Sequence, residues 1–546
     1  MTRRNRGSPR RGIVAAPQAE AAYEGARVLA AGGNAADALV SAAFVQGVVD
    51  PHRSGAGGFG CSTVFFPAPP RGGGGAPHAL AIDFHGRAGK HVRPDQWESI
   101  FESAAPDGFG YVVKGKINDV GYGAITVPGM IAGLSEIHRR YGTLPWRELV
   151  LRAVPYAADG FLVTPELAEF WIRPGLHGRV STRERLSHTP TGTAICLKPD
   201  GSTYKAVEIF RQPILAETYR RMAEEGPDSF YRGSLGAAIA ADWERHGALV
   251  TREDLESYRP EVREPLAGAY AGLQLLTTPL PGGGVALLQA LRLLEGVDLP
   301  ALGHNTPDYI DAVAPVLAAV WSDRLTHQGD PKFGGLSTEQ LLADDYVRAL
   351  RAGQGAPAGA DSESTTQLSI VDREGNAISF CHSLGYGSGV FTEGLGFMYN
   401  NCMSAFDPRP HRRNSAAPGK ARSTAVAETI LLEDGRARLV LGSPGAARIT
   451  AGLVQAILNV VAFDMTAAEA VVHPRFDAYG ERKLVLESRF PQPLVSELRA
   501  RGWDVLQSAK PFGVVGRVYA VDLDPTGVRT PIAAVDPGEP GAAYLH

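Results

Sequence analysis

The sequence predicts a layered fold of helices and strands, with helices on both faces of a β-rich centre. Segments whose apolar residues recur at helical spacing occur near both ends of the chain. Strand-like segments rich in β-branched and aromatic residues lie between them, separated by glycine and proline turns. Each kind of segment must bury an apolar side against another layer, so helices packed on both faces of the strands are the expected arrangement.

The predicted elements follow one another along the chain with local start and stop signals. Ala19–Ala31 has helical apolar spacing and ends at Gly32-Gly33, which can form a helix C-cap. The other predicted helices are Asn34–Val49, Pro128–Tyr141, Trp146–Asp159, Ile214–Glu225, Leu235–His246, Val285–Glu295 and Ile449–Val461. The predicted strands are Ser62–Phe66 and His78–Phe84, which form a hairpin, then Gly268–Thr277, Leu368–Val371, Ala377–Leu384 and Leu439–Leu441.

Length and composition are those of a globular protein. The 546 residues suggest two to four domains or one large layered domain. Hydrophobic residues make up 44% and charged residues 21% of the chain. The net charge of -4 and pI near 6.4 provide no basic surface for nucleic acid. We therefore expect a small-molecule partner rather than a nucleic acid.

Neither a targeting segment nor a membrane span is predicted. The arginines between Arg3 and Arg11 precede only a short apolar run before Pro17, too short for a signal peptide. The longest apolar stretches, such as Val285–Leu294 and Leu453–Met465, contain polar residues and are too short to cross a bilayer. We expect a soluble, cytoplasmic protein that does not contact a membrane, and the sequence leaves the assembly of several copies open.

No metal or cofactor is predicted. The four cysteines have no metal-ligand spacing, and the histidines include no H-E-x-x-H pair. The glycine clusters Gly72–Gly75 and Gly282–Gly284 are flanked by proline rather than by phosphate-binding residues, so turns are expected there. The cysteines are Cys61, Cys196, Cys381 and Cys402.

The most informative segment begins at a pair of threonines. Residues 351–361 are small and polar, as in an exposed loop, and the strand-like run Thr365–Val371 follows soon after. A threonine hydroxyl is a weak nucleophile, but cleavage before Thr365 would create an α-amine beside it that can act as its base. A threonine-rich edge strand is the alternative that this segment alone leaves open.

The turn after this strand places a second hydroxyl beside Thr365. Asp372-Arg-Glu-Gly375 fits a type I turn followed by a bulge, which pairs Asp372 with Asn376 in a hairpin. Counting outward, Thr365 faces Ser383, and opposed residues share one face of a sheet with Cβ atoms about 4.5–5.5 Å apart. Ser383 can therefore hydrogen-bond the proposed nucleophile; a register error of one residue would place it on the other face.

A strand-turn-helix segment provides a candidate oxyanion hole. Gly442-Ser-Pro-Gly-Ala-Ala-Arg448 lies between a predicted strand and a predicted helix. Backbone N–H groups at such a helix start lack intrahelical acceptors and carry partial positive charge. A tetrahedral acyl intermediate needs such donors. Alone, this segment is also compatible with an ordinary tight connection.

These motifs together resemble the γ-glutamyltranspeptidases, N-terminal nucleophile hydrolases that cleave themselves into two subunits. The resemblance extends over nearly the whole chain. It is carried by Leu29-Ala-Ala-Gly-Gly-Asn-Ala-Ala-Asp37, Gly55-Ala-Gly-Gly-Phe59, Ile82-Asp-Phe84, Val127-Pro-Gly-Met-Ile-Ala-Gly133, Tyr141-Gly-Thr-Leu-Pro145, Thr365-Thr366, Val371-Asp-Arg-Glu-Gly-Asn376, Asn400-Asn401 and Leu441-Gly-Ser-Pro-Gly445.

The resemblance implies an α+β fold, a four-layer αββα sandwich. Residues 1–364 would form a large subunit and 365–546 a small one, both within one αββα domain after autoproteolysis. Thr365 would be the processing and catalytic nucleophile, and Ser383 its supporting hydroxyl. Gly445 and Ala446 fall on the oxyanion-hole pair, where the alanine keeps the backbone donor.

Two departures from the family concern substrate binding. The family holds the glutamyl α-carboxylate with an arginine after the Asp-Phe pair and with two serines. Here His85 follows that pair, Arg87 comes two residues later, and the serine pair is Thr424-Ala425. Arg87 and Thr424 could still hold a carboxylate.

The α-amino group of the substrate would also find a changed site. Its acceptors in the family are an asparagine, a glutamine or glutamate, and an aspartate. The matching positions are Gly385, Cys402 and Ala405, with Asp407 as a nearby substitute. Because a buried ammonium without acceptors is costly, the γ-glutamyl clamp is predicted to be largely dismantled.

The sequence supports three functional hypotheses. The first is an autoprocessed amide hydrolase or acyltransferase that uses water or an amine as acceptor and acts on γ-glutamyl or glutaryl-like amides. The second is a pathway-specific biosynthetic enzyme that uses the same threonine on another amide or a carbon–carbon bond. The third is a non-catalytic scaffold, which retention of Thr365, Ser383 and the Gly-Ser-Pro-Gly turn disfavours.

Overall fold

A computed structural model provides the coordinates for most of the chain. Several features of the sequence lie outside the described residues. They are the turn predicted at Gly72–Gly75, the arginines from Arg3 to Arg11, the loop 351–361, and Ser364, which directly precedes the predicted cleavage site. The described residues are 12–68, 77–105, 108, 110–176, 178–350, 365–523 and 531–546.

Two antiparallel sheets form the centre of the molecule. Each combines strands from before and after Thr365, so the two parts of the chain are interleaved. The first sheet has the order β20 (Ala542–Leu545), β1 (Ile13–Ala16), β11 (Thr366–Val371), β12 (Ala377–Ser383), β2 (Phe59–Phe66), β3 (His78–Phe84) and β8 (Glu261–Arg263). The second has the order β19 (Ile532–Val535), β18 (Tyr519–Asp522), β14 (Arg436–Gly442), β13 (Thr429–Glu433), β10 (Leu273–Thr277) and β9 (Leu266–Tyr270).

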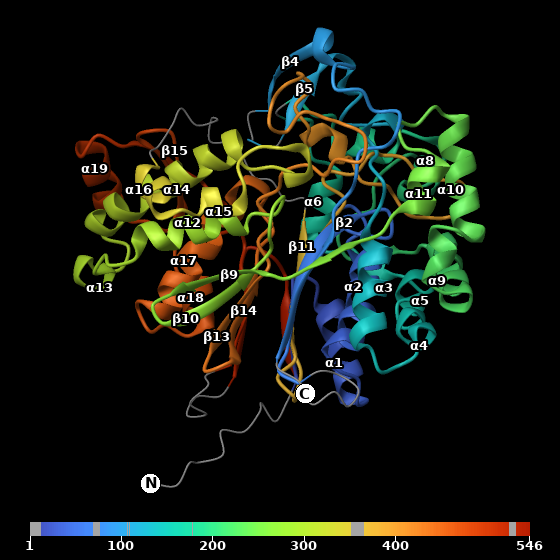
Figure 1. The fold of residues 1–546 in the computed structure, drawn as a ribbon. Coiled ribbons are helices and arrows are strands. Elements are labelled where there is room, and N and C mark those ends of the chain that lie inside the picture. The colour runs from blue at the N-terminus through green and yellow to red at the C-terminus, as the bar shows by residue number, and fades with distance from the viewer. Residues whose placement is uncertain are drawn as a thin grey trace.

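Helices cover the outer face of each sheet, and the whole is a four-layer αββα sandwich of the N-terminal nucleophile hydrolase type (Figure 1). The first sheet is covered mainly by α1 (Ala19–Ala30), α2 (Ala35–Val49), α3 (Met130–Tyr141), α4 (Trp146–Leu151), α5 (Val154–Ala158) and α9 (Pro213–Glu225). The second is covered by α12 (Gly284–Leu294), α14 (Pro307–His327), α17 (Ile449–Val461) and α18 (Ala467–Val472). The predicted fold class is therefore confirmed.

The remaining helices and strands lie around this sandwich. The helices are α6 (Pro165–Trp171), α7 (Thr182–Leu186), α8 (Pro190–Cys196), α10 (Ser234–Arg245), α11 (Arg252–Ser257), α13 (Leu299–Leu302), α15 (Thr338–Leu341), α16 (Asp344–Ala349) and α19 (Gln492–Ala500). The strands are β4 (Phe101–Ala104), β5 (Tyr111–Val113), β6 (Phe161–Leu162), β7 (Ile209–Phe210), β15 (Phe476–Tyr479), β16 (Lys483–Leu486) and β17 (Asp504–Gln507).

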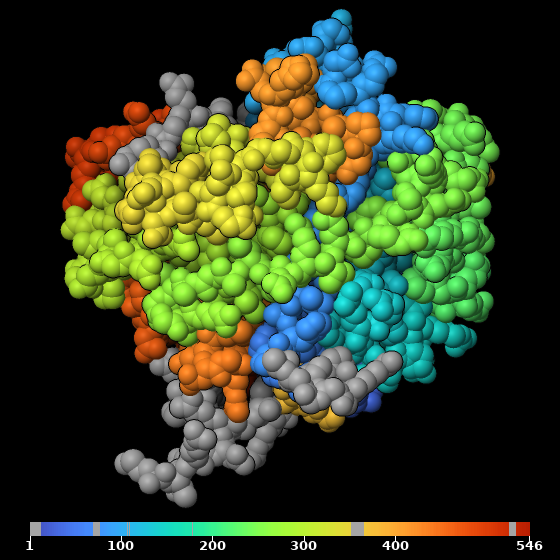
Figure 2. Space-filling view, in the orientation of Figure 1, coloured from blue at the N-terminus to red at the C-terminus, as the bar shows by residue number. Residues whose placement is uncertain are grey.

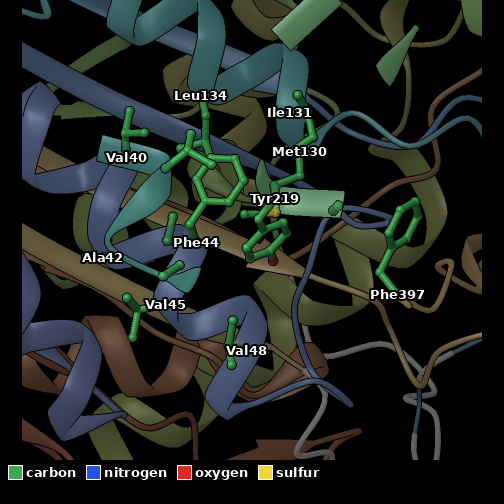
Figure 3. Close-up of a cluster of buried hydrophobic side chains, with 14 of the residues drawn as sticks. Val40, Ala42, Phe44, Val45, Val48, Met130, Ile131, Leu134, Tyr219 and Phe397 are labelled. Atoms are coloured by element: carbon green, nitrogen blue, oxygen red, sulfur yellow. The ribbon is translucent and has the colours of Figure 1, made fainter. Parts of the chain in front are cut away.

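Helix α2 is the buried centre of the first helical layer (Figure 3). Asn34 caps it, accepting hydrogen bonds from the N–H groups of Ala36 and Asp37. Every residue of the helix is buried, and its many alanines let neighbouring helices approach closely. Phe44 packs edge-on against Tyr219, with ring centroids 5.0 Å apart. Helix α2 packs behind strands β11 and β12.

Two predicted elements are divided in the structure. The predicted helix Trp146–Asp159 is broken into α4 and α5. The predicted strand Gly268–Thr277 is wrong, because β9 and β10 form a hairpin instead. At its turn Ala271 has φ 49° and Gly272 has φ 83°, the pair of positive values that a tight two-residue hairpin turn requires.

A small layer lies at the upper edge of the sandwich. Figure 2 shows residues near 100, in light blue, beside residues near 410, in orange. The 3-10 turn η6 (Cys402–Ala405) packs against β5, and Phe406 and Ala416 share a hydrophobic cluster with Val113. No helix in the described part of the chain is long and apolar enough to cross a membrane.

Candidate active site

The hairpin β11–β12 places Thr365 beside Ser383. Its ladder runs from Thr366 opposite His382 to Val371 opposite Ala377, which confirms the predicted register. Oγ1 of Thr365 lies 3.3 Å from Oγ of Ser383. Both side chains are buried, Thr365 with 7% and Ser383 with 2% of its surface exposed. The structure therefore brings the two predicted catalytic hydroxyls into contact.

Ser383 is itself held by the turn that follows it. Its Oγ accepts a hydrogen bond from the N–H of Gly385 at 2.8 Å. Gly385 has φ 66°, and a Cβ there would lie 2.4 Å from Oδ1 of Asn401, so the position requires glycine. Asn401 Oδ1 also accepts from Tyr386 N at 2.9 Å. The turn thus fixes the serine hydroxyl toward the threonine.

A row of side chains extends from Thr365 across neighbouring strands. Ser383 pairs with Phe59 on β2, and Gly60 pairs with Phe84 on β3, so His85 is next in the row. The rings of Phe59 and His85 have centroids 5.7 Å apart. Opposed residues share a face, so this row forms one wall beside the nucleophile. The sequence analysis did not assign Phe59 a role.

The end of β14 lies against the start of β11. A Cβ on Gly442 would lie 2.1 Å from Nε2 of Gln367, two residues beyond Thr365. The Gly-Ser-Pro-Gly turn leaves β14 at this point and leads through η7 (Ala446–Arg448) into α17. The candidate oxyanion loop and the candidate nucleophile are therefore at the same end of the two packed sheets.

The backbone of this loop has an unusual conformation. Gly445 has φ 140° and Ala446 has φ 46°. A Cβ on Gly445 would lie 2.7 Å from the Cα of Gly516, so only glycine fits. Within the described residues no acceptor is hydrogen-bonded to the N–H of either Gly445 or Ala446. These are donors of the kind that a developing oxyanion requires.

The two candidate substrate residues that follow β3, His85 and Arg87, contact protein groups. His85 Nδ1 lies 2.9 Å from Oδ1 of Asp83. Burial favours a protonated Asp83, but His85 and Arg87 outweigh it and lower the pKa of that carboxyl. Arg87 forms an ion pair with Glu261 and lies 3.7 Å from Asp330 and 3.9 Å from Asp83. Its guanidinium is thus already surrounded by three carboxylates.

Two more predicted substrate residues are Thr424, in the loop before β13, and Cys402, at the start of η6. Thr424 Oγ1 accepts from Val426 N at 3.2 Å, and its own N–H donates to Pro281 O at 3.0 Å. Cys402 is buried at the start of η6. Burial raises the pKa of its thiol, and the neighbouring Arg422 opposes the rise. Cys402 therefore provides no negative charge for a substrate ammonium.

Asp407 forms a local ion pair. Its two carboxylate oxygens accept from Arg409 at 2.9 and 2.8 Å, a bidentate pair. The guanidinium of Arg409 stacks on Phe101 of β4, 4.4 Å from the ring centroid. Asp407 is 3% exposed. The charge of the predicted substitute acceptor is thus compensated within the upper layer.

Known proteins are similar to this chain over nearly its whole length. The sequence profile described as gamma-glutamyltranspeptidase matches residues 21–545. The acylase ACY 1 proenzyme of Pseudomonas sp. (strain V22) is 33% identical over 541 residues, covering 95% of this chain and 91% of that protein. The glutathione hydrolase proenzyme of Pseudomonas aeruginosa is 31% identical, covering 94% and 93%. The cephalosporin acylase structure from Bacillus halodurans has a TM-score of 0.85 and 26% identity, covering 100% and 97%.

The sandwich and its relatives define a class of hydrolases and acyltransferases whose members include proenzymes. Within that class, the chain belongs to the gamma-glutamyltranspeptidase family. It is a divergent member, because identity to the glutathione hydrolases and acylases compared is between 28 and 33%.

Proposed function

We propose that this protein is an autoprocessed acyl-amide hydrolase or acyltransferase whose nucleophile is Thr365. The contact between Thr365 Oγ1 and Ser383 Oγ at the start of β11 is the observation that carries the proposal. Cleavage before Thr365 frees its α-amine, which then serves as the base for its own hydroxyl. The fragments 1–364 and 365–546 are the proposed subunits. Because both sheets contain strands from each fragment, they should remain associated.

The proposed reaction proceeds through an acyl-enzyme. The α-amine accepts the proton of Oγ1 while that oxygen attacks the amide carbon. The N–H groups of Gly445 and Ala446 hold the oxyanion. The carbon–nitrogen bond then breaks, and the protonated α-amine gives its proton to the leaving amine. Water, activated by the same amine, hydrolyses the ester and returns a proton to Oγ1; an amine in place of water gives acyl transfer.

Relatives with acylase names support an acyl amide as the substrate class. The described surroundings of the site favour an acyl group without an α-amino group, because Gly385 and Ala405 carry no acceptor and Asp407 is paired with Arg409. We therefore place glutaryl-like amides beside γ-glutamyl amides as candidate substrates.

The test of this function is hydrolysis of γ-glutamyl, glutaryl and simple acyl anilides by purified wild type and Thr365→Ala. We expect release of aniline by wild type alone. A Thr365→Ala protein that is as active as wild type would overturn the proposed nucleophile, and the absence of turnover by a processed wild type would favour the scaffold hypothesis.

A further inference from the structure

The residue that follows the candidate nucleophile is anchored on the opposite face of the sheet. Thr366 is the first residue of β11, and successive side chains of a strand point to opposite faces. Thr365 is directed to Ser383, so Thr366 is directed to the helical layer that contains α2. Its buried Oγ1 donates to Oε1 of Gln18 at 3.1 Å and accepts from Nε2 of Gln46 at 3.0 Å. The hydroxyl is thus held by two residues from the N-terminal part of the chain.

Gln46 joins α2 to both strands of the hairpin. Besides Thr366 Oγ1, its Nε2 donates to the carbonyl oxygen of Gln367 at 3.1 Å. Its Oε1 lies 2.7 Å from Nε2 of His382, the residue opposite Thr366 on β12. An amide oxygen only accepts hydrogen bonds, so Nε2 of His382 carries the proton. Burial lowers the pKa of His382 to about 3, so this ring is neutral and donates through that single N–H.

Asp50 sets the orientation of Gln18. Asp50 lies at the C-terminal end of α2, and its Oδ2 accepts a hydrogen bond from Nε2 of Gln18. Burial raises the pKa of Asp50 to about 6, and the charge of Arg53 opposes the rise. Above that pKa the carboxylate only accepts hydrogen bonds, so Gln18 turns its amide nitrogen to Asp50 and its oxygen to Thr366. The hydrogen bonds from Thr366 through Gln18 to Asp50 therefore run in one direction.

Cleavage would change what holds Thr365 in place. In the precursor, peptide bonds tether this residue on both sides, whereas cleavage before Thr365 leaves it at a chain end. Chain ends are poorly ordered unless tertiary contacts tie them down. Thr365 lies just before β11, and the adjacent Thr366 is tied down through its side chain. A displacement of about 1 Å can cost a reaction about 10²-fold in rate, so an anchor at this point bears on catalysis.

We propose that Thr366 and Gln46 are positioning residues, which hold the new N-terminal Thr365 with its hydroxyl toward Ser383 after cleavage. This inference rests on the proposed function of Thr365. Thr366 and Gln46 act from the face of the sheet opposite to Thr365, so they position the nucleophile without touching the substrate. Their loss should therefore change kcat rather than KM, and turnover more than the cleavage of the chain itself.

The first test removes the hydroxyl of Thr366 and keeps the shape of the side chain. On the anilide that wild type cleaves fastest, processed Thr366→Val should have a kcat lowered by about ten- to a hundredfold and a KM within about threefold of wild type. Thr366→Ser keeps the hydroxyl, so its kcat should stay within about threefold of wild type. The rate of maturation, followed by intact mass, should fall less than kcat in Thr366→Val, because the precursor is tethered on both sides.

A matched control distinguishes positioning from stability. Thr63→Val on β2 also removes a buried hydroxyl, which donates to the carbonyl oxygen of Glu428 at 2.7 Å. It should lower the melting temperature as Thr366→Val does and keep the wild-type kcat. Gln46→Met removes the amide that holds Thr366 and should reproduce the loss of kcat. If Thr366→Val does not fold, Gln46→Met carries the same comparison.

Hydrogen exchange on the processed protein provides a readout that needs no turnover. Amides at the start of β11 should exchange about tenfold faster or more in Thr366→Val than in wild type, and Thr63→Val should leave their exchange unchanged. Failure of the proposed function is distinguishable, because a processed wild type that cleaves no anilide but shows this difference would keep the anchor and lose the reaction.

Three results would overturn the inference. The first is a kcat within about threefold of wild type in both Thr366→Val and Gln46→Met. The second is an equal loss of kcat in Thr366→Ser and Thr366→Val, because the hydroxyl would then not be the anchor. The third is the same loss of kcat in Thr63→Val, which would make the loss a consequence of lower stability.

Discussion

Nε2 of Gln367 donates a hydrogen bond to Oε2 of Glu428 at 2.7 Å, and this bond joins the strand after Thr365 to the second sheet. Ser379 donates to the same oxygen. Glu428 is fully buried, and burial raises the pKa of its carboxyl to about 8, although both hydrogen bonds oppose the rise. Burial therefore favours the protonated form of Glu428, and its partner Gln367 lies two residues after the candidate nucleophile.

This carboxyl should make stability depend on pH. The pKa of Glu428 rises from 4.5 to about 8 in the folded protein. Between these values the unfolded chain releases the proton while the folded protein keeps it, so stability falls as pH rises, by about 1.4 kcal/mol per pH unit at most. Glu428→Gln, which cannot ionise, should lose less stability than wild type between pH 5 and 8.

Melting temperatures at pH 5, 6, 7 and 8 provide the measurement. The difference between Glu428→Gln and wild type should grow in favour of the variant across this series. Glu295→Gln, at an exposed position, should run parallel to wild type. Parallel curves for Glu428→Gln would mean that Glu428 is ionised at neutral pH.

Removing the Ser383 hydroxyl should slow maturation or turnover without unfolding the protein. Ser383→Ala deletes the partner of Thr365 Oγ1 and the acceptor of Gly385 N–H. We expect a loss of about tenfold in rate, the scale of one hydrogen bond. The matched control is Ser369→Ala, a buried serine on the partner strand β11 that donates to Tyr519 O. Equal processing and rates in Ser383→Ala and wild type would remove the role assigned to Ser383.

The candidate oxyanion loop should respond differently to two conservative changes. Gly445→Ala places a Cβ 2.7 Å from the Cα of Gly516 and should displace the donor, lowering kcat by about 10²-fold or more. Ala446→Gly keeps the backbone N–H and relieves a left-handed φ of 46°, so it should keep activity without loss of melting temperature. Full activity in Gly445→Ala would show that this N–H does not bind the oxyanion.

The positions that would accept the α-amino group of a γ-glutamyl substrate predict which anilide is cleaved faster. An α-ammonium finds no described carboxylate at Gly385, Cys402 or Ala405, so its desolvation opposes both binding and reaction. Glutaryl anilide should be cleaved at least as well as γ-glutamyl anilide. A hundredfold preference for γ-glutamyl, about 2.7 kcal/mol in transition-state binding, would contradict this. Loss of such a preference in Asp407→Asn would then identify Asp407 as the acceptor.

Local signals allowed the β11–β12 hairpin to be predicted from sequence. The turn Asp372–Gly375 sets the register by itself, with Asp372 N donating to Asn376 O at 3.0 Å and Gly375 at φ 83°. The layered architecture followed from periodicity and from the resemblance to the family. In contrast, β1 and β20 are four-residue strands, and β1 pairs with residues more than 350 positions away, so no local pattern indicates them.

The row of side chains beside Thr365 could not be read from the sequence in the same way. Phe59 and Thr365 come from distant segments that strand pairing aligns, and Arg422 of a third segment lies over the Phe59 ring. Arg87 was predicted as a carboxylate ligand from its closeness to the Asp-Phe pair. Its ion pairs with Glu261 and Asp330 depend on tertiary contacts that the sequence does not reveal. Its role in substrate binding remains a prediction.

The central claim is that the chain cleaves itself before Thr365. Intact-mass spectrometry of purified wild type should find two chains, which scaling 57.9 kDa by length puts at about 39 kDa for residues 1–364 and about 19 kDa for residues 365–546. The smaller chain should begin at Thr365, and Thr365→Ala should remain one inactive chain of full mass. A wild type that is a single intact chain and still hydrolyses acyl anilides would contradict the account.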